Sequence, residues 1–207
     1  MKPVLRVLIV EDSEFDAQMI TSLVRKSGYE VVSERVETAD ALARTLSEKK
    51  WDIILSDYNL PTFSAPEALK IVQDSNLDLP FIIISGGIGE ATAVAAMKAG
   101  AHDYLMKGNL SRLSPAIERE LREAANRRER REAREKLLES ELRYRMLWES
   151  SPDAVLLMDS ESKTLFANPA VEVVFGYKPE EIIGKALATL LPKELRSNDA
   201  VAIEGYL

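Results

Sequence analysis

The stretch Trp51-Asp-Ile-Ile-Leu-Ser-Asp-Tyr-Asn-Leu-Pro61 joins a short apolar run to a polar turn. The Ile-Ile-Leu run at 53–55 has no polar alternation, which is typical of a strand buried on both faces of a parallel sheet. Turn chemistry follows at once, because Pro61 cannot continue a ladder and asparagine tolerates turn conformations. The sequence therefore predicts a carboxylate, Asp57, where a central strand ends, at the edge where open α/β sheets bind ligands.

Four more apolar runs predict strands on either side of this one, at 4–10, 30–36, 81–84 and 104–106. Helical spacing separates them, and we expect helix caps at Asp12 or Ser13, at Thr38, and at Ser64 with Glu67 as a capping box. Strands that alternate with helices form a doubly wound parallel sheet with right-handed crossovers. Five strands favour the flavodoxin-like order 2-1-3-4-5 over the six-stranded dinucleotide-binding type.

The chain changes character near residue 114, where Ser114 as cap and Pro115 at the first helical position predict a long helix. Residues 118–136 are almost wholly Arg and Glu, which favours a solvated helix held by Glu–Arg pairs. A dimeric coiled coil, and so a homodimer through this linker, is the open alternative. Its broken apolar seam would consist of Ile117, Leu121, Ala124, Leu138, Leu142 and Trp148.

A second compact pattern begins after Ser151-Pro152-Asp153. Residues 154–158 and 164–167 predict two short strands, and short helices are expected to start at Asn168-Pro169 and at Pro179. Two strands make a marginal sheet, so we expect this α+β domain to be cut short at residue 207.

Composition excludes several classes of function. The 207 residues are 46% hydrophobic and 29% charged, as in globular proteins, and no apolar run approaches the roughly 20 residues of a membrane helix. The net charge of -7 argues against generic nucleic-acid binding. The absence of cysteine excludes thiolate metal sites, and the single histidine, His102, excludes a histidine cluster. Without a signal-peptide pattern at the N-terminus, we expect a cytoplasmic location and no membrane association.

The expected strand ends carry a set of chemically active groups: Glu11 and Asp12, Asp57, Ser85 and Lys107. The topology predicts that they converge on one small concavity. Three carboxylates at close range favour a cation, and oxygen ligands alone favour Mg²⁺. With an ammonium and a hydroxyl beside them, they suit phosphoryl transfer to Asp57. Each residue alone is more often a turn former, a cap or a solvated charge, so the combination carries the prediction.

Residues 3 to about 120 resemble the receiver domain of two-component response regulators. The matching pieces are Val7-Leu-Ile-Val-Glu-Asp12, Asp52-Ile-Ile-Leu-Ser-Asp57-Tyr-Asn-Leu-Pro61, Ile82-Ile-Ile-Ser85-Gly and Gly100-Ala-His-Asp-Tyr-Leu-Met-Lys107. The resemblance implies that Asp57 is the phosphoacceptor and that Lys107 pairs with the phosphoryl group. It also implies Mg²⁺ ligands at Asp12, Asp57 and the backbone carbonyl of Asn59, with Glu11 in support. Ser85 and Tyr104 would be the switch residues.

Two positions depart from the receiver pattern: Gly108 replaces a common proline, and Ala65 replaces a common turn glycine. The loop after the last strand is therefore expected to be looser, and the turn at residue 65 to differ. Neither position touches the acceptor.

Residues from about 142 resemble the front half of a PAS domain, on the strength of Asn168-Pro-Ala170, Phe175-Gly-Tyr177 and Glu180-Glu-Ile-Ile-Gly184. The expected organisation is a receiver at 1–120, a helical linker at 121–147 and the N-terminal part of a PAS-like domain at 148–207.

The resemblance implies that Asp57 accepts a phosphoryl group from phosphohistidine on a sensor kinase or phosphotransfer protein. The receiver would catalyse its own phosphorylation and dephosphorylation, and the chain would contain no output enzyme. The change in its surface would pass through the helix to the PAS-like region. Two alternatives stay open: a metal-dependent phosphohydrolase, which lacks the expected second acid at Asn59, and a docking module that never receives phosphate.

Overall fold

The computed structural model of the chain describes residues 2–87 and 89–186. The chain divides into two compact units, Met1–Arg131 and Glu132–Leu207. The part of the expected second domain beyond residue 186 lies outside the described residues. In the described ranges, no helix combines the length and the apolar character needed to cross a lipid bilayer.

The first unit is built on a five-stranded parallel sheet with the order β2-β1-β3-β4-β5, as the sequence predicts. Its strands are β1 (Val4–Val10), β2 (Glu30–Val36), β3 (Ile53–Asp57), β4 (Phe81–Ser85) and β5 (Asp103–Met106). The register pairs Val10 with Ser56 and Asp57 with Ile84. The carboxyl ends of β1, β3 and β4 therefore meet at one edge of the sheet.

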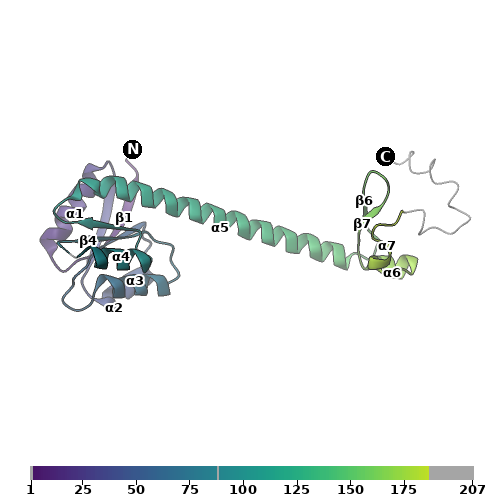
Figure 1. Cartoon of the computed structure of the whole chain (residues 1–207), viewed down its shortest axis with the longest axis horizontal. Coiled ribbons are helices and arrows are strands. Elements are labelled where there is room, and N and C mark those ends of the chain that lie inside the picture. The colour runs from purple at the N-terminus through teal and green to yellow at the C-terminus, as the bar shows by residue number, and fades with distance from the viewer. Residues whose placement is uncertain (1, 88, 187–207) are drawn as a thin grey trace, which may run out of the picture. The chain divides into compact units, whose positions relative to one another are not determined.

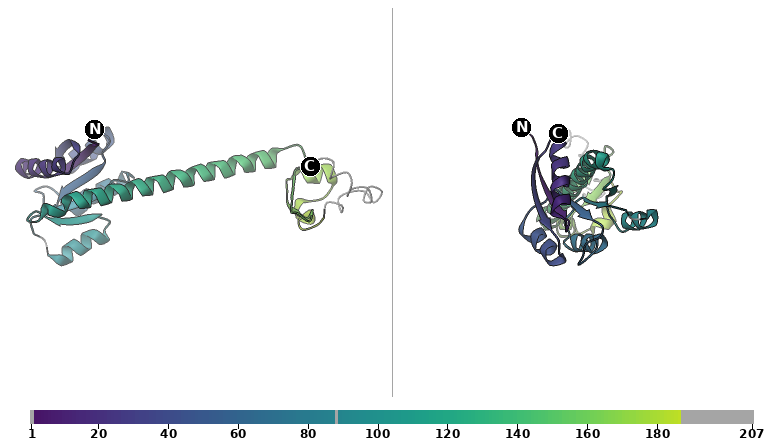
Figure 2. Two further views of the ribbon diagram at one scale, coloured as in Figure 1. Left: turned by 90° about the horizontal axis from the view of Figure 1, so that it is seen from above. Right: turned by 90° about the vertical axis from the view of Figure 1, so that its left-hand side faces the viewer.

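Helices cover both faces of this sheet (Figures 1 and 2). They are α1 (Glu14–Lys26), α2 (Ala39–Glu48), α3 (Ala65–Asp74), α4 (Glu90–Lys98) and the start of α5 (Leu113–Ser150). Alternate residues of β3 point to opposite cores: Leu55 packs with α1 and α5, and Ile54 packs with α2 and α3. Both side chains are buried, which confirms the predicted central strand.

Capping residues start the helices where the sequence predicts. The Ser13 side chain accepts a hydrogen bond from the backbone N–H of Asp16, at 3.2 Å, and Thr38 caps α2. Ser64 and Glu67 form the expected capping box of α3. These caps fix where each helix leaves the sheet edge.

The start of α5 differs from the prediction. A 3₁₀ turn, η1 (Leu110–Arg112), leads directly into α5 at Leu113, so Ser114 is not a cap and Pro115 is the third helical residue. The Leu113 side chain is buried in the core, so the helix starts one residue before Ser114. Proline is tolerated in a first turn because its missing N–H needs no partner there. Ser114 instead shares a hydrogen bond with the Ser27 hydroxyl.

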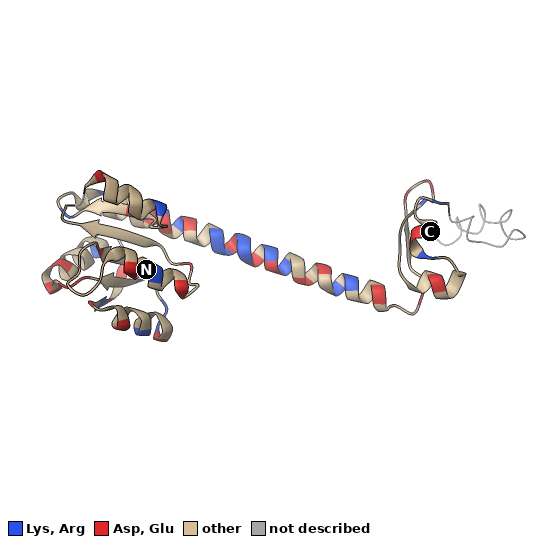
Figure 3. Cartoon of the chain, turned by 60° about the horizontal axis from the view of Figure 1, so that its bottom comes forward, with Lys and Arg blue, Asp and Glu red and all other residues tan. Residues whose placement is uncertain are grey.

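The first part of the predicted coiled-coil seam is wrong. Ile117 and Ala124 are buried, Ile117 in the core of the first unit itself, so neither is free to meet a second helix. Charged residues dominate the middle of α5 (Figure 3), and Arg143 pairs with Glu139 at 2.9 Å, the kind of Glu–Arg pair expected of a solvated helix. Leucines farther along, Leu138 and Leu142, are exposed.

The second unit contains the predicted antiparallel pair, β6 (Leu156–Met158) and β7 (Thr164–Ala167), followed by α6 (Ala170–Phe175) and α7 (Pro179–Ile182). Asn168 is fully buried and ties the chain together. Its Oδ1 accepts from the Val155 N–H at 2.8 Å, and its Nδ2 donates to the carbonyls of Asp153 and Trp148. Val171 and Ile182 form a small core in this unit.

Candidate phosphoacceptor site

Three carboxylates gather at the carboxyl edge of the sheet. Glu11 and Asp12 follow β1 directly, and Asp57 is the last residue of β3. One carboxylate oxygen from each lies within 4.8 Å of the others. Glu11 is buried and Asp12 is exposed, so the cluster opens to solvent on one side.

Lys107, directly after β5, reaches this cluster. Its Nζ donates hydrogen bonds to Glu11 Oε2 at 2.9 Å, to Asp57 Oδ2 at 3.0 Å and to Asp16 Oδ2 at 2.5 Å. The backbone N–H of Lys107 donates to the Ser85 carbonyl at 2.7 Å, which fixes the base of the side chain beside β4. The predicted convergence of strand-end groups is therefore present for these residues.

The electrostatics of the cluster follow from burial and from Lys107. Burial raises the pKa of the Glu11 carboxyl, although its hydrogen bonds with Lys107 and Ser13 oppose that shift. Burial alone would lower the pKa of the Lys107 ammonium, but hydrogen bonds to Asp16, Glu11 and Asp57 raise it above the usual value. Lys107 is consequently a permanent positive charge beside Asp57.

The chemistry of the donor set suits a hard divalent cation. The three clustered groups offer oxygen atoms alone, and the exposed Asp12 leaves room for water ligands. Mg²⁺ binds through one or two carboxylates and keeps several waters. Glu11, Asp12 and Asp57 therefore fit this ion.

The two predicted switch residues lie on β4 and β5. Ser85 is buried, and its hydroxyl accepts a hydrogen bond from the Gly87 N–H at 3.4 Å. The Tyr104 ring packs against the core on the α2–α4 side, and in the described part of the chain its buried hydroxyl has no hydrogen-bond partner. The ring thus already lies inward in this structure.

The loop after β3 carries the remaining predicted residue. Asn59 is exposed and forms an isolated bridge with Ser64, which folds the loop back to α3. Ala65, at the position where a turn glycine is common in receivers, is buried and donates its N–H to the Tyr58 carbonyl at 3.0 Å. A Cβ at Gly108 would meet nothing within 4 Å, so no neighbouring atom requires glycine at this position.

Sequence reasoning missed two residues of the site. Asp16 contacts Lys107, and Arg35 on β2 donates from Nη1 to the carbonyls of Glu11 at 2.9 Å and Asp12 at 3.2 Å. Asp16 could have been found from the sequence, because it occupies the first turn of a helix that starts at the ligand-binding edge. Arg35 had no such signal, because the predicted strand order places β2 beside β1 but does not tell which side chain of β2 reaches the loop after β1.

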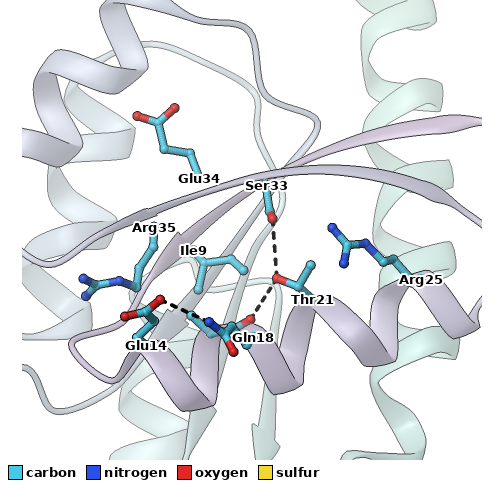
Figure 4. Close-up of a pocket in the computed structure, with 9 residues that line it drawn as sticks. Ile9, Glu14, Gln18, Thr21, Arg25, Ser33, Glu34 and Arg35 are labelled. Atoms are coloured by element: carbon cyan, nitrogen blue, oxygen red, sulfur yellow. Dashed lines mark hydrogen bonds between the residues drawn. The ribbon is translucent and has the colours of Figure 1, made fainter.

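Arg35 also lines a polar hollow between α1 and β2, with a volume of about 560 Å³ (Figure 4). Thr21 and Ser33 share a hydrogen bond across it, and Arg25 lies at its other end. Neither Asp57 nor Lys107 lines this hollow, so it is separate from the acidic cluster.

The fold and the site define a receiver, and family comparison agrees. Residues 7–118, more than half of the chain, match the family model of the response regulator receiver domain, and the chain belongs to that family. Residues 142–206 match the PAS fold. The predicted pairing of a receiver with a PAS domain is confirmed.

Individual relatives resemble the first unit. The chain is 32% identical over 102 residues to the chemotaxis protein CheY of Thermotoga maritima, covering 49% of this chain and 84% of that protein. It is 33% identical over 116 residues to the transcriptional regulatory protein ZraR of Salmonella typhimurium, covering 56% of this chain but 26% of ZraR. The signal receiver domain of a LuxO repressor protein from Vibrio parahaemolyticus superposes with a TM-score of 0.54 and 27% identity, covering 61% of this chain and 95% of that domain.

Proposed function

We propose that Asp57 accepts a phosphoryl group from a phosphohistidine on a partner kinase or phosphotransfer protein. The observation that carries this proposal is the position of the Lys107 ammonium, 3.0 Å from Asp57 Oδ2, beside three carboxylates that share a 4.8 Å cluster. His102 is half-buried, and its Nδ1 accepts a hydrogen bond from the Phe81 N–H, which argues against His102 itself as the donor histidine.

In the proposed step, a lone pair of an Asp57 carboxylate oxygen attacks phosphorus in line with the phosphorus–nitrogen bond. That bond breaks, and its electron pair stays on the donor imidazole. Lys107 stabilises the negative charge that spreads over the equatorial oxygens. Glu11, Asp12, Asp57 and the Asn59 carbonyl would hold Mg²⁺, which supplies further charge neutralisation when bound.

The proposal is tested by incubating the protein with acetyl phosphate and following its intact mass. One added phosphoryl group is expected with Mg²⁺ and not with a chelator. The addition is expected to vanish in Asp57→Asn and to persist in Asp74→Asn, an exposed aspartate at the end of α3. Modification of Asp57→Asn to the same extent as the unchanged protein would refute the assignment of the acceptor.

The same experiment separates the two alternatives. A docking module would bind no Mg²⁺ and gain no mass. A phosphohydrolase would release phosphate from a generic ester through many turnovers, whereas a receiver is expected to be modified once and then to lose the group slowly.

The proposal extends to organisation: a receiver at 1–120, a linker at 121–147 and a PAS-like domain at 148–207. It is supported by the continuity of α5, which begins with the buried Leu113 and runs unbroken to Ser150. We propose that phosphorylation alters the β4–β5 face beside the start of α5 and that the helix carries the change onward. The acyl phosphate brings roughly -1.5 to -2 charge and three acceptor oxygens in place of the single carboxylate charge of Asp57, enough to repack neighbouring groups. A cytoplasmic location stays a prediction.

We also propose a homodimer through the later part of α5. Leu138 and Leu142 are 57% and 51% exposed and lie one turn apart, so they offer an apolar row to a second copy. Sedimentation velocity tests this: the double change Leu138→Lys with Leu142→Lys is expected to give monomer, and a dimer that survives it would contradict the proposed contact.

A further inference from the structure

The Lys107 ammonium has no spare hydrogen-bond donor. An ammonium group carries three N–H donors, and the structure gives Lys107 three carboxylate acceptors, on Glu11, Asp16 and Asp57. The bond to Asp16 is the shortest of the three, at 2.5 Å. The direction in which the third N–H points is therefore fixed by the two acids that hold the other two.

The Asp16 carboxylate does not make the hydrogen bond that is usual for its position in a helix. The residue three places after an N-cap often bonds back to the N-cap N–H, as Glu67 does to Ser64 in α3, at 2.7 Å. In α1 the Ser13 N–H is taken by Glu11 Oε1 at 3.1 Å instead. The Asp16 side chain is thereby left free of the helix terminus and reaches Lys107.

The Asp16 backbone is held in place at the same time. Its N–H donates to the Ser13 hydroxyl at 3.2 Å, which anchors the first turn of α1 against the β1–α1 loop. The carboxylate is 26% exposed, and Asp16 is not among the three clustered metal-type ligands. It contacts the lysine without being part of the candidate cation site.

We propose that Asp16 is a positioning residue for phosphoryl transfer. Together with Glu11 it orients the Lys107 ammonium, so that the third N–H points at Oδ2 of Asp57. This inference rests on the proposed phosphoacceptor role of Asp57. When the phosphoryl group arrives, one of its oxygens replaces the carboxylate oxygen as acceptor of that N–H, while Asp16 and Glu11 keep their bonds.

A purely electrostatic role predicts the opposite outcome. Asp16 adds a negative charge beside a site that binds anionic phosphodonors, so charge alone would make its removal favour donor binding. Positioning instead predicts a slower transfer step, because a loosened lysine no longer meets the transition state in the right geometry. The two effects therefore differ in sign and in the kinetic constant that they change.

The test measures the rate of Asp57 phosphorylation in the full chain across a range of acetyl phosphate concentrations with saturating Mg²⁺. Asp16→Ala is expected to lower the maximal rate about tenfold at an unchanged half-saturating donor concentration. Asp16→Asn keeps an acceptor oxygen of the same reach and is expected to recover part of the rate. Asp40→Ala removes an exposed acid from the first turn of α2, far from Lys107 in sequence, and is expected to match the unchanged protein.

The outcomes distinguish this inference from the function on which it rests. A chain that never becomes modified at Asp57 overturns the proposed function. A chain that is modified, but whose maximal rate is unchanged or raised in Asp16→Ala, overturns the positioning role alone. If the alanine variant does not fold, the nearly isosteric Asp16→Asn tests the positioning role in its place. A maximal rate at or above that of the unchanged protein contradicts the proposal.

Discussion

Two nitrogens of Arg127, on α5, donate hydrogen bonds to the Asp78 carboxylate in the loop before β4. Nε and Nη2 lie 3.1 and 2.8 Å from Asp78 Oδ1. Nη2 also lies 3.3 Å from His102 Nε2. This contact lies at the edge of the sheet opposite Asp57, where α5 makes its last turns within the first unit. It ties the helix to the sheet at a second place, beyond the buried Leu113 and Ile117.

Loss of the Arg127–Asp78 contact is expected to lower the stability of the first unit. Asp78→Ala should lower the free energy of unfolding by about 1 kcal/mol, since the pair is partly buried and doubly bonded. Urea denaturation measures this. Glu139→Ala, which breaks the highly exposed Arg143–Glu139 pair, is the matched control and is expected to change little. Equal losses in the two variants would contradict an anchoring role for Arg127.

His102 makes the same region sensitive to acid. Burial and the nearby Arg127 guanidinium lower the pKa of His102 below 6.5, against weaker opposing effects of Glu120, Asp78 and Glu123. Between the folded pKa and 6.5, the unfolded chain binds more protons than the folded one, so stability rises with pH and is lost as pH falls through this window.

The measurement is the free energy of unfolding at several pH values in the unchanged protein and in His102→Gln. The difference between the two curves isolates the histidine from Glu11, whose raised pKa removes stability as pH rises above 4.5. The unchanged protein is expected to lose more stability on acidification below pH 6.5 than the variant. Parallel curves would show that His102 titrates alike in both states.

Tyr104 has a buried hydroxyl without a partner in the described part of the chain. An unpaired buried hydroxyl is costly, so Tyr104→Phe is expected to raise the free energy of unfolding by about 1 kcal/mol and to favour the inward ring. Thermal unfolding tests this, with Tyr144→Phe as the control because Tyr144 is 70% exposed. A destabilised Tyr104→Phe would mean that the hydroxyl has a partner in solution.

Arg35 braces the loop that carries two of the carboxylates. Arg35→Ala frees the carbonyls of Glu11 and Asp12, so we expect Mg²⁺ affinity to fall by about tenfold, within the range seen when outer groups that orient metal ligands are lost. Isothermal titration calorimetry measures the affinity. Arg25 lines the same hollow without bonding to that loop (Figure 4). The variant Arg25→Ala is therefore the control and is expected to leave the Mg²⁺ affinity unchanged. Equal affinities in the Arg35 and Arg25 variants would contradict the bracing role.

The parts of the fold that sequence predicts best are those with local causes. The unbroken apolar run of β3 and the caps at Ser13, Thr38 and Ser64 mark their elements without help from tertiary structure. The start of α5 was misplaced because the burial of Leu113 decides it, and burial is a tertiary property. Ile117 and Ala124 were likewise assigned to a seam because their spacing fits a helix partner and a sheet equally well.

The site divides in the same way. The strand-end groups Glu11, Asp12, Asp57 and Lys107 were predictable, because parallel strands bring their carboxyl ends to one edge. Arg35 was not, because its role depends on how far a side chain reaches between neighbouring strands.

The central claim is that Asp57 carries an acyl phosphate, and locating the modified residue tests it most directly. The protein is phosphorylated with acetyl phosphate and Mg²⁺, the acyl phosphate is trapped by borohydride reduction, and peptides are mapped by mass spectrometry. The account predicts that Asp57 alone is reduced, and only in the phosphorylated sample. Reduction at another carboxylate with Asp57 intact, or at none in a sample shown to carry phosphate, would contradict it.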